Sequence, residues 1–360
     1  MTNTDNTARQ DWLDFLQSQG ASVTNGMVTK FATTNAAASP EATILYDLSH
    51  KGIIKACGEE AQSFLQNQFC NDVRTVSETT SQLNGYCTPK GRLLAFFRLW
   101  QHDDCYYLSL PRERLAATLK RLQMFVLMSK VTLSDASDAL ISIGITGAHA
   151  EALLRDHFGA DSEAVPSQAD ECRHQQDVSL ICVPGNTPRF EISGPVAAMQ
   201  SLWQALAGKA HCAADDAWRW QDIHAGIPQI VDATAEAFVP QMVNLELIHA
   251  LSFKKGCYPG QEIVARTHYL GKQKRRMYLA HVDSPALPAP GESIVARDDS
   301  SGQSVGTVVS AAPAPDGGAD LLAVLQIKHA VEGELLLSSA PNTQLILKDL
   351  PYSVEVEDSA

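Results

Sequence analysis

Apolar residues repeat with different periods along the chain, and these periods predict its elements. Within residues 8–18, Trp12 and Leu16 fall on one face of an amphipathic helix. Residues 32–41 are small, polar and unpatterned, which is typical of a linker. We expect the helix to dock on the folded body or on another subunit, and the body to begin near Ala42.

Three later segments share one local plan, in which a short apolar strand ends in glycine and a helix follows at once. The glycine removes the steric limits on a sharp turn. These segments are residues 53–68, 140–158 and 190–206. Between the first two we expect strands at 83–88, 92–101 and 106–110, and then a helix at 112–128; residues 159–176 read as a loop. This order predicts α+β layers of the split βαβ, ferredoxin-like type.

The pattern changes after Arg276 to short strands separated by Gly, Pro, Asp and Ser clusters. Such spacing is typical of an all-β module, and we expect a small β-barrel. The predicted strands are residues 277–282, 305–310, 321–327, 335–338 and 345–347.

Composition narrows the class of protein. A chain of 360 residues suits two or three domains, and 45% hydrophobic with 19% charged residues is typical of a folded globular protein. The net charge of -13 argues against bulk nucleic-acid binding, because the surface repels phosphates. No apolar run is long enough to span a membrane, and the first residues do not resemble a signal peptide. We therefore expect a cytoplasmic protein without membrane contact.

The eight cysteines form no C-x-x-C pair and have no zinc-ligand spacing to histidines. We therefore predict no metal site, and we expect reduced thiols that mostly pack in cores rather than disulfides. Phosphate-loop, esterase, zincin and Rossmann motifs are also missing from the sequence.

Residues 218–276 mix charged, aromatic and glycine residues without amphipathic periodicity, which is typical of a site rather than a core. Within them, Cys257 comes just before a turn and a predicted helix at 261–267. The helix N-terminus favours a thiolate, and Lys254 or Lys255 would add positive charge if its side chain folded back. Cys257 is thus either a reactive thiol or a structural cysteine in a tight loop.

Other side chains of this segment also allow two interpretations. Glu262 and Arg266 lie four apart, which favours an ion pair along the helix, with contacts to a pterin ring and a carboxylate tail as the alternative. Trp218 and Trp220 would face different sides of a helix, so one belongs in the core and the other could offer a flat surface. The basic run from Arg266 to Arg276 is either solvated surface or a site for phosphates, a folate tail or RNA.

The run Lys255–Glu262, K-G-C-Y-P-G-Q-E, resembles the K-G-C-[FY]-x-G-Q-E signature of the YgfZ family. These proteins are folate-binding relatives of the glycine-cleavage T-protein that support iron–sulphur enzymes. Residues 265–271 continue the match as in mitochondrial iron–sulphur assembly relatives. Further matches lie at residues 90–92, 225–228, 238–241 and 244–245, and the resemblance spans residues 43–355.

The resemblance implies a T-protein-like three-domain ring around a channel that binds tetrahydrofolate or a derivative. Its divisions would be an N-terminal extension and linker at 1–41, a folate-binding domain at 42–135 plus 212–272, a ferredoxin-like domain at 136–211 and a barrel at 273–360. Trp218 corresponds to a folate-linked tryptophan of the family, whereas a second one, expected near Lys51, is missing. Cys257 would be the working thiol, with Gln261, Glu262 and Arg266 as further folate contacts.

Two departures from the aminomethyltransferases bear on mechanism. Their Asp-Asp pair falls at about Leu94 and Ala95, and the Glu of their Glu-Ala-Gly motif is replaced by His224. Without the acid that polarises the folate nitrogen, we do not expect the glycine-cleavage transfer. The resemblance therefore implies an accessory protein for assembly or repair of iron–sulphur enzymes, including radical enzymes that thiolate tRNA. The alternatives are a folate-dependent aminomethyltransferase or demethylase and, third, an RNA-binding modification factor.

Overall fold

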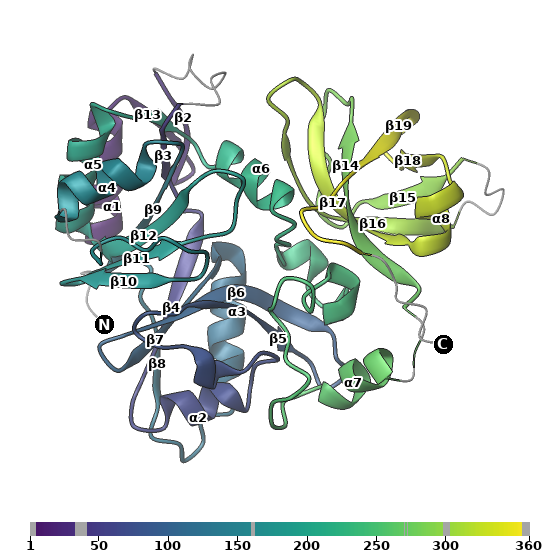
Figure 1. Cartoon of the computed structure of the whole chain (residues 1–360), viewed down its shortest axis with the longest axis horizontal. Coiled ribbons are helices and arrows are strands. Elements are labelled where there is room, and N and C mark those ends of the chain that lie inside the picture. Colours follow the sequence, from purple (N-terminus) through teal and green to yellow (C-terminus); the bar gives the residue numbers. More distant parts are fainter. Residues whose placement is uncertain are drawn as a thin grey trace. The chain divides into compact units, whose positions relative to one another are not determined.

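We describe a computed structural model of the chain, which covers residues 5–32, 42–159, 163–269, 271, 273–297 and 303–354. The chain forms two compact units (Figure 1). The first comprises Met1–Phe64, Arg74–Gln82 and Arg98–Trp218, and the second comprises Leu65–Val73, Leu83–Phe97 and Arg219–Ala360.

A six-stranded sheet with the order β10-β11-β12-β9-β3-β13 belongs to the first unit. Its neighbouring strands are antiparallel except for the parallel pair β3 and β13. The strands are β3 (Ile44–Asp47), β9 (Leu140–Thr146), β10 (Cys172–Gln175), β11 (Val178–Cys182), β12 (Arg189–Pro195) and β13 (His211–Ala213).

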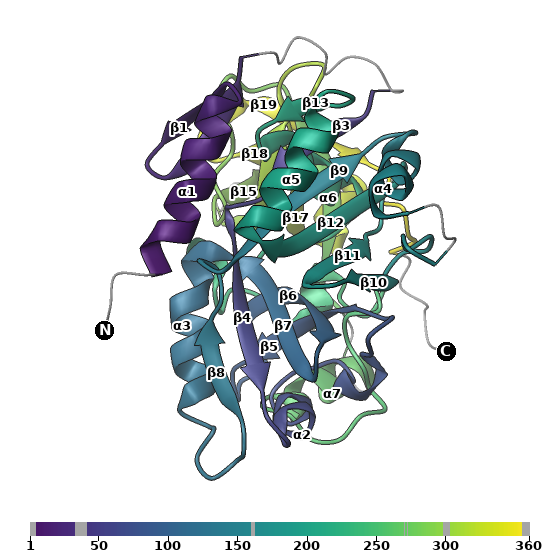
Figure 2. The same ribbon diagram turned by 90° about the vertical axis from the view of Figure 1, so that its left-hand side faces the viewer.

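Three helices cover one face of this sheet: α1 (Asp5–Ser18), α4 (Ala150–Phe158) and α5 (Val196–Ala207) (Figure 2). Alternate strand residues point to opposite faces, so Leu180 joins the core under the helices while Ile181 joins a second core with Trp100 and Tyr107. The hairpin of β1 (Ala21–Thr24) and β2 (Met27–Phe31) adds to the helix-covered core.

A five-stranded sheet has the order β5-β6-β7-β4-β8. The division between the two units falls within β5 and within β6. Its strands are β4 (Lys51–Cys57), β5 (Gln82–Cys87), β6 (Leu93–His102), β7 (Cys105–Pro111) and β8 (Thr132–Asp135). The nearby helical segments are α2 (Ala61–Gln66), η1 (Val73–Thr75) and α3 (Arg112–Gln123).

The second unit contains a closed barrel with the order β14-β17-β16-β15-β18-β19 (Figure 1). Its strands are β14 (Arg275–Val282), β15 (Ser293–Ala296), β16 (Ser304–Pro313), β17 (Ala319–Gln326), β18 (Leu335–Leu337) and β19 (Ala340–Lys348), with helix α8 (Ile327–Glu332). Before the barrel come α6 (Asp216–His224), η2 (Asp232–Thr234), η3 (Pro240–Val243) and α7 (Gln261–Tyr269). Helix α6 begins in the first unit and ends in the second.

Most predicted elements are confirmed, including the C-terminal barrel, the N-terminal helix and the helix after Cys257. Gly58 and Gly147 end their strands with positive φ angles of 130° and 121°, as the strand-turn-helix plan predicts. Gly194 differs, because β12 continues through it to Pro195. Helix α1 docks on the body, where Trp12 packs edge-to-face on Trp203 of α5.

Other expectations are wrong in detail. The first core already includes Val28 and Phe31, so packed structure begins before Ala42. Residues 172–175 form a strand within the predicted loop, and α3 ends at Gln123 rather than at residue 128. Residues 33–41 of the linker predicted at 32–41 lie outside the described residues, and the four-part domain division stays a prediction.

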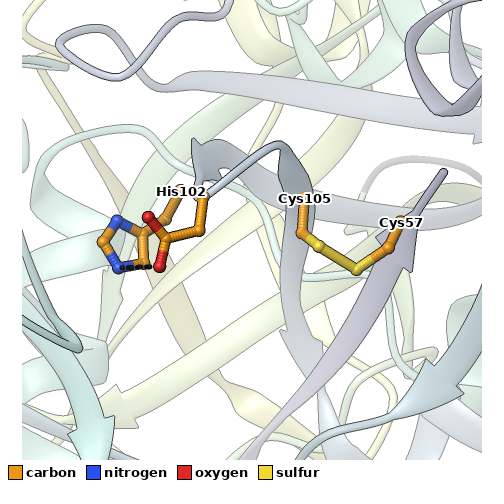
Figure 3. The surroundings of a disulfide bond; sticks show 4 residues. Cys57, His102 and Cys105 are labelled. Carbon is orange, nitrogen blue, oxygen red and sulfur yellow. Dashed lines mark ion pairs between the residues drawn. A yellow bond between two sulfur atoms is a disulfide. The ribbon is translucent and has the colours of Figure 1, made fainter. Parts of the chain in front are cut away.

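One expectation about the cysteines is also wrong. Cys57 and Cys105 form a disulfide (Figure 3). The antiparallel register of β4 and β7 places these two residues directly opposite each other, with Cα atoms 4.4 Å apart, which is within the usual range for a disulfide. Four of the remaining cysteines, at 70, 87, 172 and 182, are buried as expected. None of the helices in the described ranges has the length and apolar character needed to cross a bilayer.

Candidate functional site

The segment just before α7 exposes one thiol between anchored neighbours. Cys257 is exposed, whereas Lys255 and Tyr258 on either side of it each keep only 6% of their surface accessible. Gly256 has no atom within 4 Å of the position where a Cβ would stand. The backbone is therefore packed at both ends of a short loop whose cysteine side chain is exposed to solvent.

Lys255 anchors the N-terminal end of this loop. Its ammonium donates to the backbone carbonyls of Gln66, Phe69 and Asn71 at 2.6, 2.5 and 3.0 Å. Three carbonyl dipoles thus solvate a buried charge. Lys255 therefore does not fold back toward the thiol of Cys257.

Gly260 anchors the C-terminal end of the loop, because its turn packs closely on the turn that contains Gly91. A Cβ at Gly260 would lie 2.4 Å from the carbonyl oxygen of Thr88 and 2.6 Å from the amide nitrogen of Gly91. Gly260 and Gly91 have positive φ angles of 84° and 68°, which favour glycine. Residues 88–92 form the predicted hairpin, in which the Thr88 amide donates to the Arg92 carbonyl at 2.8 Å. The motif loop thus packs backbone to backbone on this hairpin.

Helix α7 carries three further side chains of the predicted site, Gln261, Glu262 and Arg266. The Gln261 amide donates at 3.4 Å to the carbonyls of Lys255 and Gly256, so it links the helix to the residues just before Cys257. Glu262 and Arg266 are both exposed. Within the ranges the structure describes, these two side chains form no ion pair, contrary to the favoured expectation. Water solvates both charges well at such a position, so an exposed pair gains little.

Two buried thiols lie in the core of the same unit. Cys70 and Cys87 belong to the core that also holds Tyr258, and the Cys70 sulphur lies 3.5 Å from the Ala250 carbonyl. Burial raises the pKa of Cys70, but hydrogen bonds from Cys87 and Gly85 and the charge of Lys255 outweigh it and bring the pKa below its usual value. The hydrogen bond to Cys70 and burial hold the pKa of Cys87 well above its usual value. Sequence reasoning did not single out this pair, because the two residues carry no motif.

Trp218 lies in the other unit and is fully buried. The guanidinium of Arg189 lies 4.3 Å from the centroid of its ring, and Tyr46 packs edge-to-face on it at 5.5 Å. Gly144 approaches so closely that a Cβ there would lie 2.5 Å from the indole. Its role in folate binding stays a prediction. Trp220 is only partly buried, so the two tryptophans divide between core and surface as expected.

A buried carboxylate, which the sequence did not reveal, gathers several side chains of the second unit. Asp320 of β17 accepts hydrogen bonds from the Trp220 indole at 2.8 Å and from Lys348 at 2.8 Å, and it pairs with His224 at 2.7 Å and His281 at 2.8 Å. Thus His224, at the position of the transferase glutamate, is held by a carboxylate. No local signal could have linked His224 to Asp320, because α6 and β17 are far apart in the sequence and only the tertiary fold brings these two side chains together.

The basic run after Arg266 divides among several environments. His268 stacks on Phe253 with ring centroids 3.8 Å apart, and Arg276 pairs with Glu246 and donates to the Gln241 carbonyl at 2.9 Å. Lys274 is exposed, and Lys272 lies outside the described residues. The run is therefore only partly available to a ligand.

Comparisons with known proteins agree with this architecture. Residues 14–213 match the family model described as the GCVT N-terminal domain. The aminomethyltransferase T of the glycine cleavage system from Bartonella henselae has a similar structure, with a TM-score of 0.67 and 16% identity over 93% of this chain and 95% of that chain. The expected T-protein-like fold class, mixed α and β with a closed C-terminal barrel, is confirmed.

Two relatives carry the same name, tRNA-modifying protein YgfZ. The one from Colwellia psychrerythraea is 30% identical over 88% of this chain and 95% of its own length. The one from Edwardsiella ictaluri is 30% identical over 85% of this chain and 91% of its own length. The chain therefore belongs to the YgfZ family.

Proposed function

We propose that the chain is a tetrahydrofolate-binding accessory protein that supports assembly or repair of iron–sulphur enzymes, including enzymes that thiolate tRNA, with Cys257 as the working thiol. The names of its relatives refer to tRNA modification, which supports the last part. Iron–sulphur enzymes or their assembly factors are the proposed protein partners.

The observation that carries this proposal is the exposure of Cys257 on an anchored loop. A structural cysteine would be expected in a core, as Cys70 and Cys87 are. Here Lys255, Gly260 and Gln261 instead hold the backbone on both sides of an exposed sulphur. Exposed thiols react with oxidants and bind metals more readily than buried ones, so the arrangement suits chemistry better than packing.

The folate part rests on the fold and on the side chains of α7. The similar Bartonella protein is an aminomethyltransferase, and we propose a folate site by that likeness. Glu262 can accept paired hydrogen bonds from an aminopyrimidine edge, and Arg266 can form a forked pair with a carboxylate tail. Both side chains are exposed and fit these roles. The ring of Trp218 is covered by Arg189, so stacking there would require that region to rearrange.

Aminomethyl transfer is not proposed. Leu94 and Ala95, where the transferases carry their acidic pair, are buried apolar residues of β6. They offer no group to polarise a folate nitrogen. Formation of methylene-tetrahydrofolate from an amine donor would reverse this conclusion.

The test replaces the chromosomal gene with Cys257→Ala or Cys257→Ser and measures several iron–sulphur enzymes and thiolated tRNA in the same cells. We expect these activities to fall to the level of cells that lack the protein. The control is Cys212→Ala, which changes a partly buried cysteine of β13 in the first unit. Normal enzyme activities with Cys257→Ala would exclude Cys257 as the working thiol.

A further inference from the structure

Three side chains that are far apart in the sequence meet in the first unit, whereas the motif loop belongs to the second. Glu78 lies in the turn bridged by Ser77 and Thr80, His102 ends β6, and His174 lies in β10. One potential ligand atom from each of the three lies within 4.8 Å of the others. Sequence spacing predicted no metal site, because only the fold assembles this set.

The distances between these atoms resemble those of a metal site. The Glu78 carboxylate lies 3.4 Å from Nε2 of His174 and 3.8 Å from Nδ1 of His102. In a tetrahedral zinc site with bonds of about 2.0–2.1 Å, ligand atoms are about 3.3 Å apart. The Glu78 side chain is 49% exposed, so its carboxylate can move the short remaining distance.

Neighbouring groups orient both imidazoles toward the glutamate. Nδ1 of His174 contacts the Ser179 hydroxyl at 3.0 Å, which leaves Nε2 facing the Glu78 carboxylate at 3.4 Å and the Cys172 sulphur at 3.5 Å. Nε2 of His102 lies 3.5 Å from the Asp103 carboxylate, which leaves Nδ1 facing Glu78. A carboxylate or hydroxyl behind each imidazole is the usual outer shell of a metal-binding histidine.

Apart from its ion pairs with Glu78 and Asp103, the His102 ring packs against the His174 ring, with centroids 4.2 Å apart. Both of its ring nitrogens are buried, and neither has a hydrogen bond among the described residues. Buried polar atoms are seldom left without a hydrogen bond in native proteins, so Nδ1, the nitrogen that faces Glu78, suits a metal ion as its partner.

The backbone around His102 is held in place. Asp103 and Asp104 form the two-residue turn between β6 and β7 with φ angles of 48° and 59°, which residues other than glycine seldom adopt. Cys105, opposite His102 in the ladder, is bonded to Cys57 of the next strand (Figure 3). The imidazole is thus attached to a turn that a covalent bond ties to the sheet.

We infer that Glu78, His102 and His174 bind one divalent transition-metal ion of the Zn²⁺ class, with the fourth position open to solvent beside Glu78. Two imidazoles and one carboxylate are a common donor set for zinc sites that keep a free position. The same donors also suit Fe²⁺ and Cu²⁺, which follow the same ligand preferences.

The test uses the full-length chain without an affinity tag, stripped of metal with a chelator and then titrated with Zn²⁺ against a chromophoric competitor. We expect binding of one equivalent. His102→Gln and His174→Gln should each weaken binding at least about 100-fold, because even outer-shell changes cost 10–100-fold. Co²⁺ should give the intense visible bands of a four-coordinate site in the wild type, but not in His102→Gln or His174→Gln.

Two further variants distinguish the loss of a metal ligand from a general loss of folding. Glu78→Gln changes an exposed side chain, so the protein should stay folded while binding weakens. His149→Gln is the matched control, because His149 is exposed and makes no capping bond to α4. Absence of one-equivalent binding, or equal affinity in the wild type, His102→Gln and Glu78→Gln, would overturn the inference.

Discussion

Lys255 is the residue on which the motif loop most depends. Its ammonium is buried on three carbonyls. In Lys255→Met those carbonyls lose a charged donor, so we expect the free energy of unfolding to fall by about 3 kcal/mol. Lys254→Met removes the same charge from an exposed neighbour and should change it by less than about 0.5 kcal/mol. Denaturant titrations of both variants give the comparison, and equal losses would contradict the anchoring role.

Gly260 and Gly256 form a second matched pair of residues. A Cβ at Gly260 would collide with the Thr88 carbonyl oxygen and occupy a positive φ, whereas a Cβ at Gly256 meets no atom within 4 Å. We expect Gly260→Ala to lower the free energy of unfolding by at least about 2 kcal/mol and Gly256→Ala to lower it by much less. Thermal or urea unfolding distinguishes them. A Gly260→Ala protein as stable as Gly256→Ala would show that the two turns are not tightly packed.

At this scale the sequence revealed the motif but not its contacts. Cys257 could be identified as a candidate because the residues around it match a family signature. The role of Lys255 could not be predicted, since its acceptors come from residues 66–71, far earlier in the chain. The ion pair of Glu262 and Arg266 was expected from spacing alone, which ignores how well water solvates both charges.

At the scale of elements, periodicity predicted those elements that bury a continuous apolar stripe, such as α5 and β14. Strand β10 was missed because its sequence, Cys-Arg-His-Gln, has one buried apolar residue and no alternation. Strand β15 was also missed; only two of its four residues are buried. The helix expected up to Met128 ends early. Leu127 and Met128 are apolar but exposed, so apolar residues in this stretch do not indicate a buried helix face.

The barrel and α6 share a carboxylate whose ionisation should affect stability. Burial raises the pKa of Asp320, but hydrogen bonds from His224, Lys348 and His281 outweigh it and hold the pKa well below its usual range. Stability from this carboxylate is therefore present above the unfolded-state pKa of about 3.9 and lost as pH falls below it.

Asp320→Asn should consequently lower the free energy of unfolding at pH 7 by about 3 kcal/mol and reduce its dependence on pH between 5 and 2. Asp316→Asn, on an exposed turn, is the control and should keep the wild-type pH profile. Denaturant titrations at several pH values measure both effects. A wild-type pH slope in Asp320→Asn would assign the acid sensitivity to other groups.

At the scale of the whole molecule, the fold class was predictable because a motif match extended over most of the chain. The two units could not be predicted, because each is assembled from three separate segments and the divisions fall within α2, η1, β5, β6 and α6. No Gly- or Pro-rich linker marks such crossings, so local sequence gives no sign of them.

The proposed folate binding should appear as added stability of the whole protein. Tetrahydrofolate at 100 times its dissociation constant should raise the free energy of unfolding by about 2.7 kcal/mol. Arg266→Ala should reduce this gain at the same ligand concentration, whereas Lys328→Ala, which removes one exposed positive charge from α8, should keep it. An absence of stabilisation in the wild type would contradict the proposed cofactor but leave the role of Cys257 open to the cellular test.

The two anchors of the motif loop also determine which partner must move. Displacing the loop would strip the buried ammonium of Lys255 from its acceptors and pull Gly260 away from Gly91. The backbone on both sides of Cys257 is therefore held in place. Under the proposed function, the client would be the partner that moves, bringing its cluster or sulphur atom to the thiol on a segment flexible enough to reach it.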